Sequence, residues 1–295
     1  MGATGLSLQY REVCERDNML IIFLDFKGVE WWTHDRMVEY NQPSDTNTEI
    51  ANWLRENPHR LNLGNIGLWF ADETITSEED LDYKTQVLDM WTGRATSKFA
   101  TSGDAISVET VAHPESSTVG ISIESKALGK GNLGLFFDFP YPTHDKFNAP
   151  FVGVFNLTDL HTTKLIVDDD KKTSTAEIKH ALGETEYSLF LTWEGEAEIQ
   201  GPEEGTHRYL LKTPQDELLL TAAFAETKPE SLPSFEEVNK TSEKWWREYW
   251  SNGAFLDLTA SKSEDALEIQ RRVILSQYLV AVNSASRLPP QESGT

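Results

Sequence analysis

The sequence predicts a mainly β protein, a large antiparallel β-sandwich with a C-terminal helical tail. Between residues 19 and 226, short apolar or alternating runs end repeatedly at Gly, Pro, Asn or Asp, which is the pattern of strands joined by turns. After residue 226 the pattern changes to the wider spacing of amphipathic helices. The chain has 295 residues, of which 39% are hydrophobic, so it is long enough to bury a sizeable core.

The first half of the chain predicts a series of strands. The segments that carry the pattern are 19–32, 60–70, 84–114, 117–125 and 131–142. Segment 84–114 contains two or three strands, because "TSGD" within it supplies a hairpin turn. Pro140 and Pro142 end the last strand, since proline cannot donate to a strand ladder. Four successive hairpins are the simplest description of this half.

The second half continues with the same spacing. Its predicted strands lie in segments 162–170, 174–182, 187–195, 197–200, 207–213 and 217–226. Two motifs that suggest ligand binding are interpreted as turns. "VDDDKK" (167–172) lacks the alternation of a calcium loop, and "GKGNLG" (129–134) lacks the ending of a phosphate loop. So many short strands indicate two sheets packed face to face.

Two helices are expected after the last strand. Ser234 and Glu237 have the spacing of a capping box, and the helix they begin runs to about Trp250. Its bulky stripe is expected to pack against the sandwich, with an aromatic sugar platform as the alternative; it comprises Trp245, Trp246, Tyr249 and Trp250. The second helix covers 263–287, with Ser263 as its cap, and its apolar surface needs a partner.

Composition restricts the partners and the compartment. There are 26 basic and 48 acidic residues, a formal charge of −22, which repels nucleic acid and anionic membranes. Cys14 is the single cysteine, so no intramolecular disulfide can form, and the N-terminus lacks a signal-peptide pattern. We therefore predict a cytoplasmic protein that binds neither nucleic acid nor membranes.

No metal, cofactor or catalytic site follows from residue spacing. The seven histidines show no paired helical spacing; they are His34, His59, His113, His144, His161, His180 and His207. With 48 acidic residues, any catalytic carboxylate pair chosen by spacing would be arbitrary. We predict no metal and no cofactor, and we assign no catalytic residue from spacing alone.

Several segments resemble the six-hairpin glycosidase family of fungi and bacteria. They are "WLRENPHRLNLGNIGL" (53–68), "VLDMWTGRATSKFA" (87–100), "VETVAHPESSTVGISIES" (108–125) and "LEIQRRVILSQYLVAVNSASRLPPQESG" (267–294). Together they span most of residues 50 to 294. The resemblance implies an N-terminal β-sandwich, a linker helix and a barrel of six α-hairpins that carries the glycoside-hydrolysing pocket.

The resemblance also implies a domain organisation and two site residues. Residues 1–226 would form the sandwich, 227–262 the linker helix and connection, and 263–295 the first helix and loop of a truncated (α/α)6 barrel. "PPQESG" matches the family's loop on the pocket side, so Gln291 and Glu292 are substrate-binding candidates.

Three functions are carried forward. The first is a truncated, carbohydrate-related relative that is not a competent glycosidase alone, because hydrolysis needs two carboxyl groups about 5 to 10 Å apart. The second is a sandwich recruited as an isomerase or cyclase in small-molecule biosynthesis, with an apolar pocket between its sheets. The third is a carbohydrate-binding or interaction module. The expected partners are a carbohydrate or another small molecule, and a second copy of the chain through the C-terminal helix.

Overall fold

The structure is a computed structural model that describes residues 29–40, 61–142, 152–167, 174–183, 185–253 and 255–285. Several features considered above lie outside these residues. They are Cys14, most of segment 19–32, Asp168 to Lys172 of the "VDDDKK" motif, and the site candidates Gln291 and Glu292.

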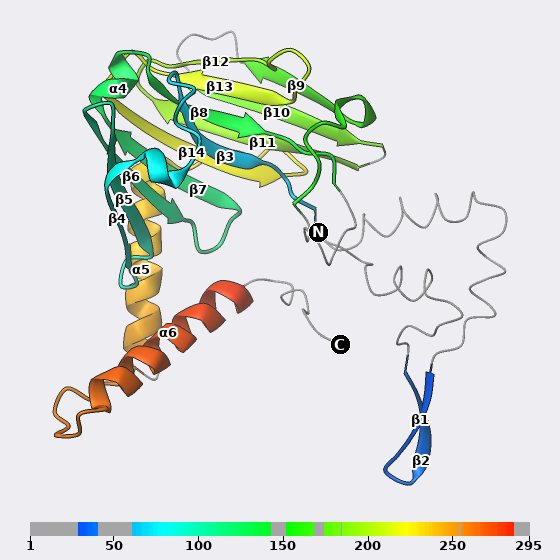
Figure 1. The fold of residues 1–295 in the computed structure, drawn as a ribbon, viewed down its shortest axis with the longest axis vertical. Coiled ribbons are helices and arrows are strands. Elements are labelled where there is room, and N and C mark those ends of the chain that lie inside the picture. Colours follow the sequence, from blue (N-terminus) through cyan, green and yellow to red (C-terminus); the bar gives the residue numbers. More distant parts are fainter. Residues whose placement is uncertain are drawn as a thin grey trace.

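The prediction of a mainly β, antiparallel fold is confirmed (Figure 1). In spatial order the eight-stranded large sheet contains β4 (Asp82–Asp89), β5 (Arg94–Thr101), β6 (Asp104–Ala112), β7 (Thr118–Glu124), β14 (Glu217–Ala225), β11 (Thr185–Glu194), β10 (Thr175–Leu182) and β9 (Thr162–Val167). The four-stranded small sheet contains β12 (Glu198–Gln200), β13 (Arg208–Lys212), β8 (Leu133–Asp138) and β3 (Asn65–Phe70). The strands β1 (Val29–Thr33) and β2 (Arg36–Tyr40) form a separate hairpin. The short helices are η1 (Glu78–Asp80), α4 (Lys126–Gly129) and η2 (Thr158–Leu160).

The description as four successive hairpins is wrong for two strands. Segment 84–114 does form three antiparallel strands, with Ser102 and Gly103 at positive φ in the predicted turn. However, β3 and β8 lie in the small sheet and pair with each other, so that Gly67 faces Phe136. Apolar alternation predicts which face of a strand is buried, but it does not specify which neighbour the strand pairs with.

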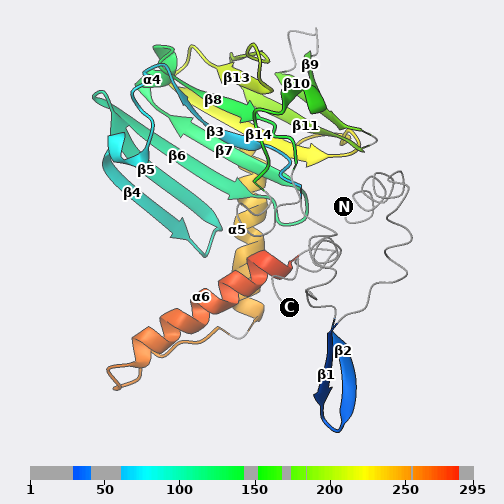
Figure 2. The same cartoon turned by 45° about the vertical axis from the view of Figure 1, so that its right-hand side comes forward.

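The two sheets enclose one hydrophobic core. Its largest fully buried side chains come from both sheets: Ile106, Ile123, Ile178, Leu189, Leu191 and Leu218 from the large one, and Leu133, Phe137, Tyr209 and Leu211 from the small one. The small sheet covers only part of the large one, because β4 is exposed at every position. Figure 2 shows β4 and β5 extending beyond the small sheet.

Helix α5 (Phe235–Asn252) begins at the predicted capping box. The Ser234 hydroxyl accepts from the Glu237 backbone N–H, and the Glu237 carboxylate accepts from the Ser234 backbone N–H at 2.7 Å. Phe235 and Val238, in the first turn, pack against Val111 of β6. The helix therefore starts on the face of the large sheet that points away from the core, which we call the outer face (Figure 1).

Helix α6 (Ala266–Ser284) begins later than predicted. Its N-cap is Asp265, so the assignment of Ser263 as cap is wrong. The Ser263 carbonyl instead accepts from Ala266 N in a turn that precedes the helix. The connection before this turn is fixed by tertiary structure, because the Gln270 side chain accepts from Leu258 N at 2.6 Å. Sequence pattern alone does not reveal such a bond.

The aromatic stripe of α5 packs in two directions. The Trp250 indole donates to the Met90 carbonyl in the β4–β5 turn at 2.7 Å, as expected for packing against the sandwich. On the other side Trp246 stacks on Tyr278 of α6, and the Tyr249 hydroxyl donates to the Gln277 carbonyl. Helix α6 is therefore held by α5. Within the described part of the chain, no helix is long and apolar enough to cross a membrane.

Candidate functional site

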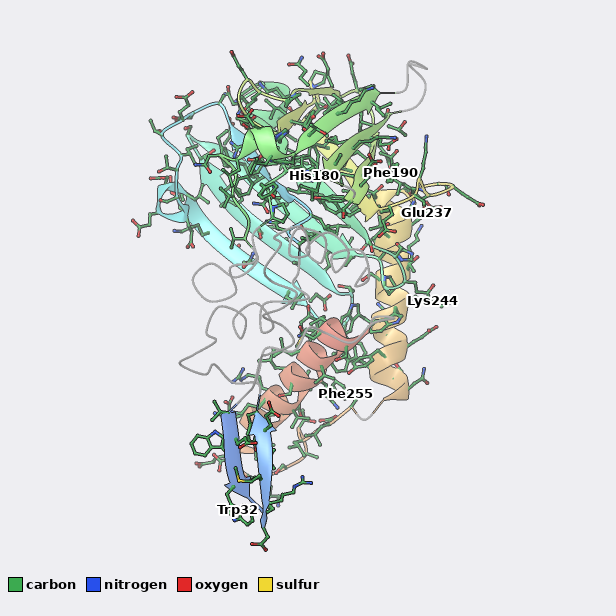
Figure 3. The ribbon with its side chains drawn as sticks, turned by 90° about the vertical axis from the view of Figure 1, so that its right-hand side faces the viewer. Trp32, His180, Phe190, Glu237, Lys244 and Phe255 are labelled. Atoms are coloured by element: carbon green, nitrogen blue, oxygen red, sulfur yellow. The ribbon has the colours of Figure 1, made fainter. Side chains whose placement is uncertain are left out.

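A groove of about 580 Å³ lies on the outer face of the large sheet. One wall is segment 228–232, which leads from β14 towards α5, and the floor is formed by β9, β10 and β11. The Thr221 hydroxyl donates to the Pro233 carbonyl at 2.8 Å and fixes the end of this wall on the sheet. Figure 3 shows Phe190 of the floor close to the chain that leads to Glu237 at the start of α5. The volume is in the usual range for a site that binds a small molecule.

The groove combines apolar and polar groups. Ile166 of the floor is 38% exposed and supplies apolar surface, whereas Phe190 beside Glu177 is only 5% exposed. Glu177 supplies a carboxylate whose Oε1 accepts from the Ser188 hydroxyl at 2.7 Å, and none of the described residues bonds its other oxygen. Further hydroxyl and charged groups come from the floor, Thr175 and Thr192, and from the wall, Lys228, Glu230 and Ser231. Aliphatic surface beside a few fixed hydrogen-bonding groups suits a sugar or another polyhydroxylated molecule.

A second groove of about 590 Å³ lies on the other side of the same wall. It shares Pro229, Ser231 and Leu232 with the first and extends over β14 to Thr118 of β7. Its carboxylate belongs to Glu237, and hydrogen bonds from Ser234 in the capping box hold the pKa of that carboxyl below its usual range. The Glu237 carboxylate already accepts hydrogen bonds from Ser234 in the capping box. The Glu177 carboxylate of the first groove is therefore the better acceptor for a ligand.

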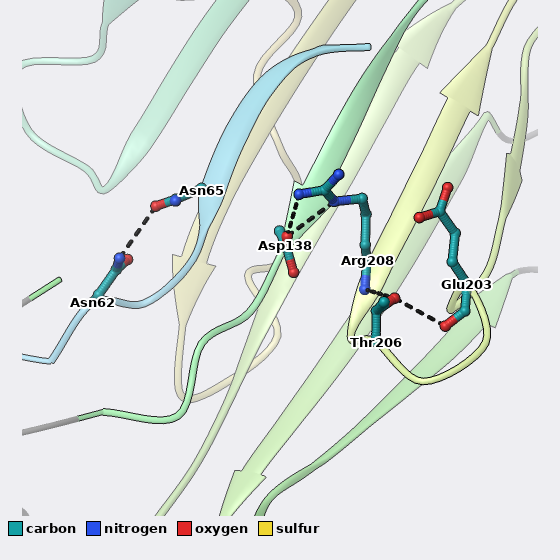
Figure 4. A network of polar contacts seen from close by, with 6 residues as sticks. All are labelled: Asn62, Asn65, Asp138, Glu203, Thr206 and Arg208. Carbon is teal, nitrogen blue, oxygen red and sulfur yellow. Dashed lines mark hydrogen bonds and ion pairs between the residues drawn. The ribbon is translucent and has the colours of Figure 1, made fainter. Parts of the chain in front are cut away.

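The outer face of the small sheet carries a different polar network (Figure 4). Arg208 donates through Nε and a terminal nitrogen to one oxygen of Asp138, at 2.9 and 2.7 Å, and its guanidinium covers Phe136. Similarly, the Lys212 ammonium lies 3.8 Å from the centre of the Trp69 ring. Cations of the protein itself therefore cover both of these rings.

The structure brings together three histidines that sequence spacing left apart. His161, His180 and His207 come from the start of β9, from β10 and from the start of β13, and they meet between the two sheets. Burial, followed by the effect of nearby imidazoles, lowers the pKa of His161 to about 4 and that of His180 to about 3. Within the described ranges, no group of three or more His, Cys, Asp or Glu side chains could hold a metal ion.

Comparison with known proteins gives distant structural likenesses. No family model matches this sequence, and no curated protein matches it. A solved structure described as a kojibiose phosphorylase from the human microbiome has 11% identity and a TM-score of 0.38, over 64% of this chain and 28% of that one. A family GH92 α-mannosidase from Bacteroides thetaiotaomicron, in complex with mannoimidazole, has 10% identity and a TM-score of 0.22, over 59% of this chain and 24% of that one. The present chain thus spans less than a third of either protein.

Proposed function

We propose that this protein is a carbohydrate-binding β-sandwich of the six-hairpin glycosidase type, and that it binds a small saccharide without cleaving it. The observation that carries the proposal is the outer groove, where the Glu177 carboxylate lies beside Phe190 and threonine hydroxyls. A carboxylate with one oxygen unused among the described residues accepts well from sugar hydroxyls, and apolar floor residues suit the C–H face of a sugar ring. The sequence resemblance to that family supports the same ligand class.

The surroundings of the two groove carboxylates support binding without hydrolysis. A glycosidase needs one carboxyl group, enclosed away from water, to donate a proton to the leaving oxygen while the second attacks or activates water. Glu177 belongs to the floor, but Glu230 is solvent-exposed on the wall. The groove therefore offers sites for hydrogen bonding, but no enclosed acid among the described residues.

The space between the sheets does not favour the isomerase or cyclase alternative. The described residues fill that space with a packed apolar core and the histidine cluster. Both grooves described above lie outside it.

A glycan array followed by calorimetry on the purified chain tests the proposal. We expect saturable binding of a mono- or disaccharide, weakened about 10- to 100-fold by Glu177→Gln, because a hydrogen bond to a charged group contributes about 1.5 to 3 kcal/mol. Glu186→Gln is the matched control, since Glu186 is exposed on the neighbouring strand β11 and does not line the groove.

Three results would contradict the proposal. An array without hits, or equal affinities for the two variants, would show that the groove is not a saccharide-binding site. Turnover of aryl glycosides that Glu177→Gln abolishes would show that the groove is catalytic.

A further inference from the structure

Hydrogen-bond partners fix which nitrogen of His180 carries the proton. The Leu63 carbonyl can only accept, so the Tyr187 hydroxyl donates to it at 2.8 Å. The Tyr187 oxygen must then accept from Nδ1–H of His180, 2.5 Å away. Neutral His180 therefore has its lone pair on Nε2.

The same reasoning continues to His161. Nδ1 of His161 lies 2.7 Å from Nε2 of His180, so Nδ1 carries the hydrogen and donates. Neutral His161 is left with a lone pair on Nε2. This atom is buried and has no hydrogen-bond partner among the described residues. His161 is 4% exposed and His180 is 0% exposed, so bulk solvent has little access to the cluster.

A second hydrogen-bonded chain beside the first is closed. Nε2 of His207 donates to the Thr158 carbonyl at 2.9 Å, and its Nδ1 accepts from the Thr163 hydroxyl at 2.7 Å. Thr163 in turn accepts from the Tyr209 hydroxyl at 2.8 Å. The ring centroids of His207 and His161 are 4.0 Å apart. Both ring nitrogens of His207 already have hydrogen-bond partners, so neither can bond to His161. Among the described residues, the unfilled acceptor of the cluster is therefore Nε2 of His161.

A proton on this nitrogen would be poorly accommodated. Each element packed against His161 and its hydrogen-bonded neighbours contributes a titratable group. These groups are His180 in β10, Tyr187 in β11, His207 just before β13, Tyr209 in β13, and Tyr141 after β8. All of them are imidazoles or phenols, and none is a carboxylate that could balance a positive charge. A buried charge without a partner is strongly unfavourable.

We propose that this histidine cluster is a proton-operated latch, which holds this end of the sandwich closed at neutral pH and opens it in mild acid. The cluster joins edge elements of both sheets. Tyr187 holds Leu63, just before the edge strand β3, while His207 holds Thr158 in η2, just before the edge strand β9. Losing the hydrogen-bonded chains releases both edges together.

The direction of the pH effect follows from the two protonation states. In the open state both histidines are solvated, with an ordinary pKa near 6.5, whereas burial depresses their pKa values in the closed state to about 4 and about 3. Below about pH 6.5 the open state binds protons that the closed state does not bind. Opening therefore becomes on the order of 100-fold more favourable between pH 6.5 and 5 if both histidines take part.

Hydrogen exchange with mass spectrometry at pH 6.5 and 5.0, corrected for intrinsic rates, tests the latch. Peptides covering β9, β10 and β13 should exchange through the local opening and lose about 100-fold protection in acid, whereas peptides covering β6, β7 and β14 should stay better protected at both pH values, because only global unfolding exposes them. In His161→Phe one titrating group is lost, and the acid response should fall to about 10-fold. His113→Phe, which changes a histidine outside the cluster, should behave like the wild type.

Equal protection of the two sets of peptides at both pH values, or an acid response that is unchanged in His161→Phe, overturns the proposal. If His161→Phe does not fold, the wild-type chain still decides the question by NMR of its histidine ring protons. The latch requires two histidines that stay neutral down to about pH 5 and then titrate as protection is lost. Titration of all histidines near pH 6.5 with protection intact excludes it.

Discussion

Trp246 of α5 stacks on Tyr278 of α6 with ring centroids 5.1 Å apart and ring planes at 23°. The same indole lies against Gly93 in the β4–β5 turn, and Trp250 one turn later is anchored to the Met90 carbonyl. One aromatic cluster thus connects the large sheet with both C-terminal helices. Helix α6 joins this cluster through Tyr278.

Gly93→Ala should destabilise the protein by about 2 to 4 kcal/mol. Gly93 has φ +68°, which costs other residues about 1 to 2 kcal/mol, and an added Cβ would collide with the Trp246 indole. Gly103→Ala is the matched control, because Gly103 has φ +85° but no atom of the described residues lies within 4 Å of the methyl group it would gain. Urea unfolding measures both, and equal losses would show that the contact with Trp246 contributes nothing.

Tyr278→Ala should loosen α6 while leaving the sandwich intact. Removing the half-buried ring takes away the stack on Trp246, and we expect a loss of about 2 kcal/mol in the docking of the helix. Amide exchange within α6 should become faster, whereas Val280→Ala, at a side chain that is 62% exposed, should change little. Unchanged exchange in Tyr278→Ala would mean that other contacts hold α6.

Global stability should fall as the pH drops below about 6.5. His161 and His180 have depressed pKa values in the folded state, so their contribution is fully present above the unfolded value of about 6.5 and is lost as protons bind the unfolded chain. At pH 5 the loss is about 2 kcal/mol for each histidine. Urea midpoints measured at pH 7.5, 6.5, 5.5 and 5.0 check this, and a flat profile across the series would contradict it.

Tyr187→Phe should cost about 2 kcal/mol without creating a cavity. The hydroxyl bridges Nδ1 of His180 and the Leu63 carbonyl, and both would stay buried without a partner. Tyr83→Phe is the control, because Tyr83 is 88% exposed. Thermal unfolding of both variants measures the difference, and equal melting temperatures would show that the hydroxyl is easily replaced.

Self-association through α6 is expected because apolar side chains still face solvent on this helix. Leu275, Leu279 and Val282 have helical three- and four-residue spacing and are 38, 49 and 49% exposed. Light scattering after size exclusion should show a concentration-dependent dimer that Leu279→Glu shifts to monomer. Ser276→Glu adds the same charge beside this stripe and should leave the mass unchanged. A monomer at every concentration would exclude this contact.

Local sequence determined the elements of this protein. Strand positions, the turn at Ser102 and Gly103, and the capping box of Ser234 and Glu237 follow from side-chain periodicity and from backbone bonds spanning a few residues. The sequence prediction misplaced the start of α6. The connection that precedes this helix is held by a hydrogen bond from Leu258 N to the side chain of Gln270, twelve residues further along the chain. Cap signals nearby in sequence cannot reveal such a bond.

Tertiary structure decided which strands became neighbours, and with them both sites. Strands with the same apolar alternation can pair in several orders. The order found here places β3 beside β8, and it places His161 beside His180, which lies 19 residues away in sequence. The outer groove likewise exists only because segment 228–232 passes beside β9, β10 and β11. Periodicity specifies what each strand buries, whereas the packing of the two sheets against one core selects the partner, because only that arrangement buries the apolar faces of both sheets together.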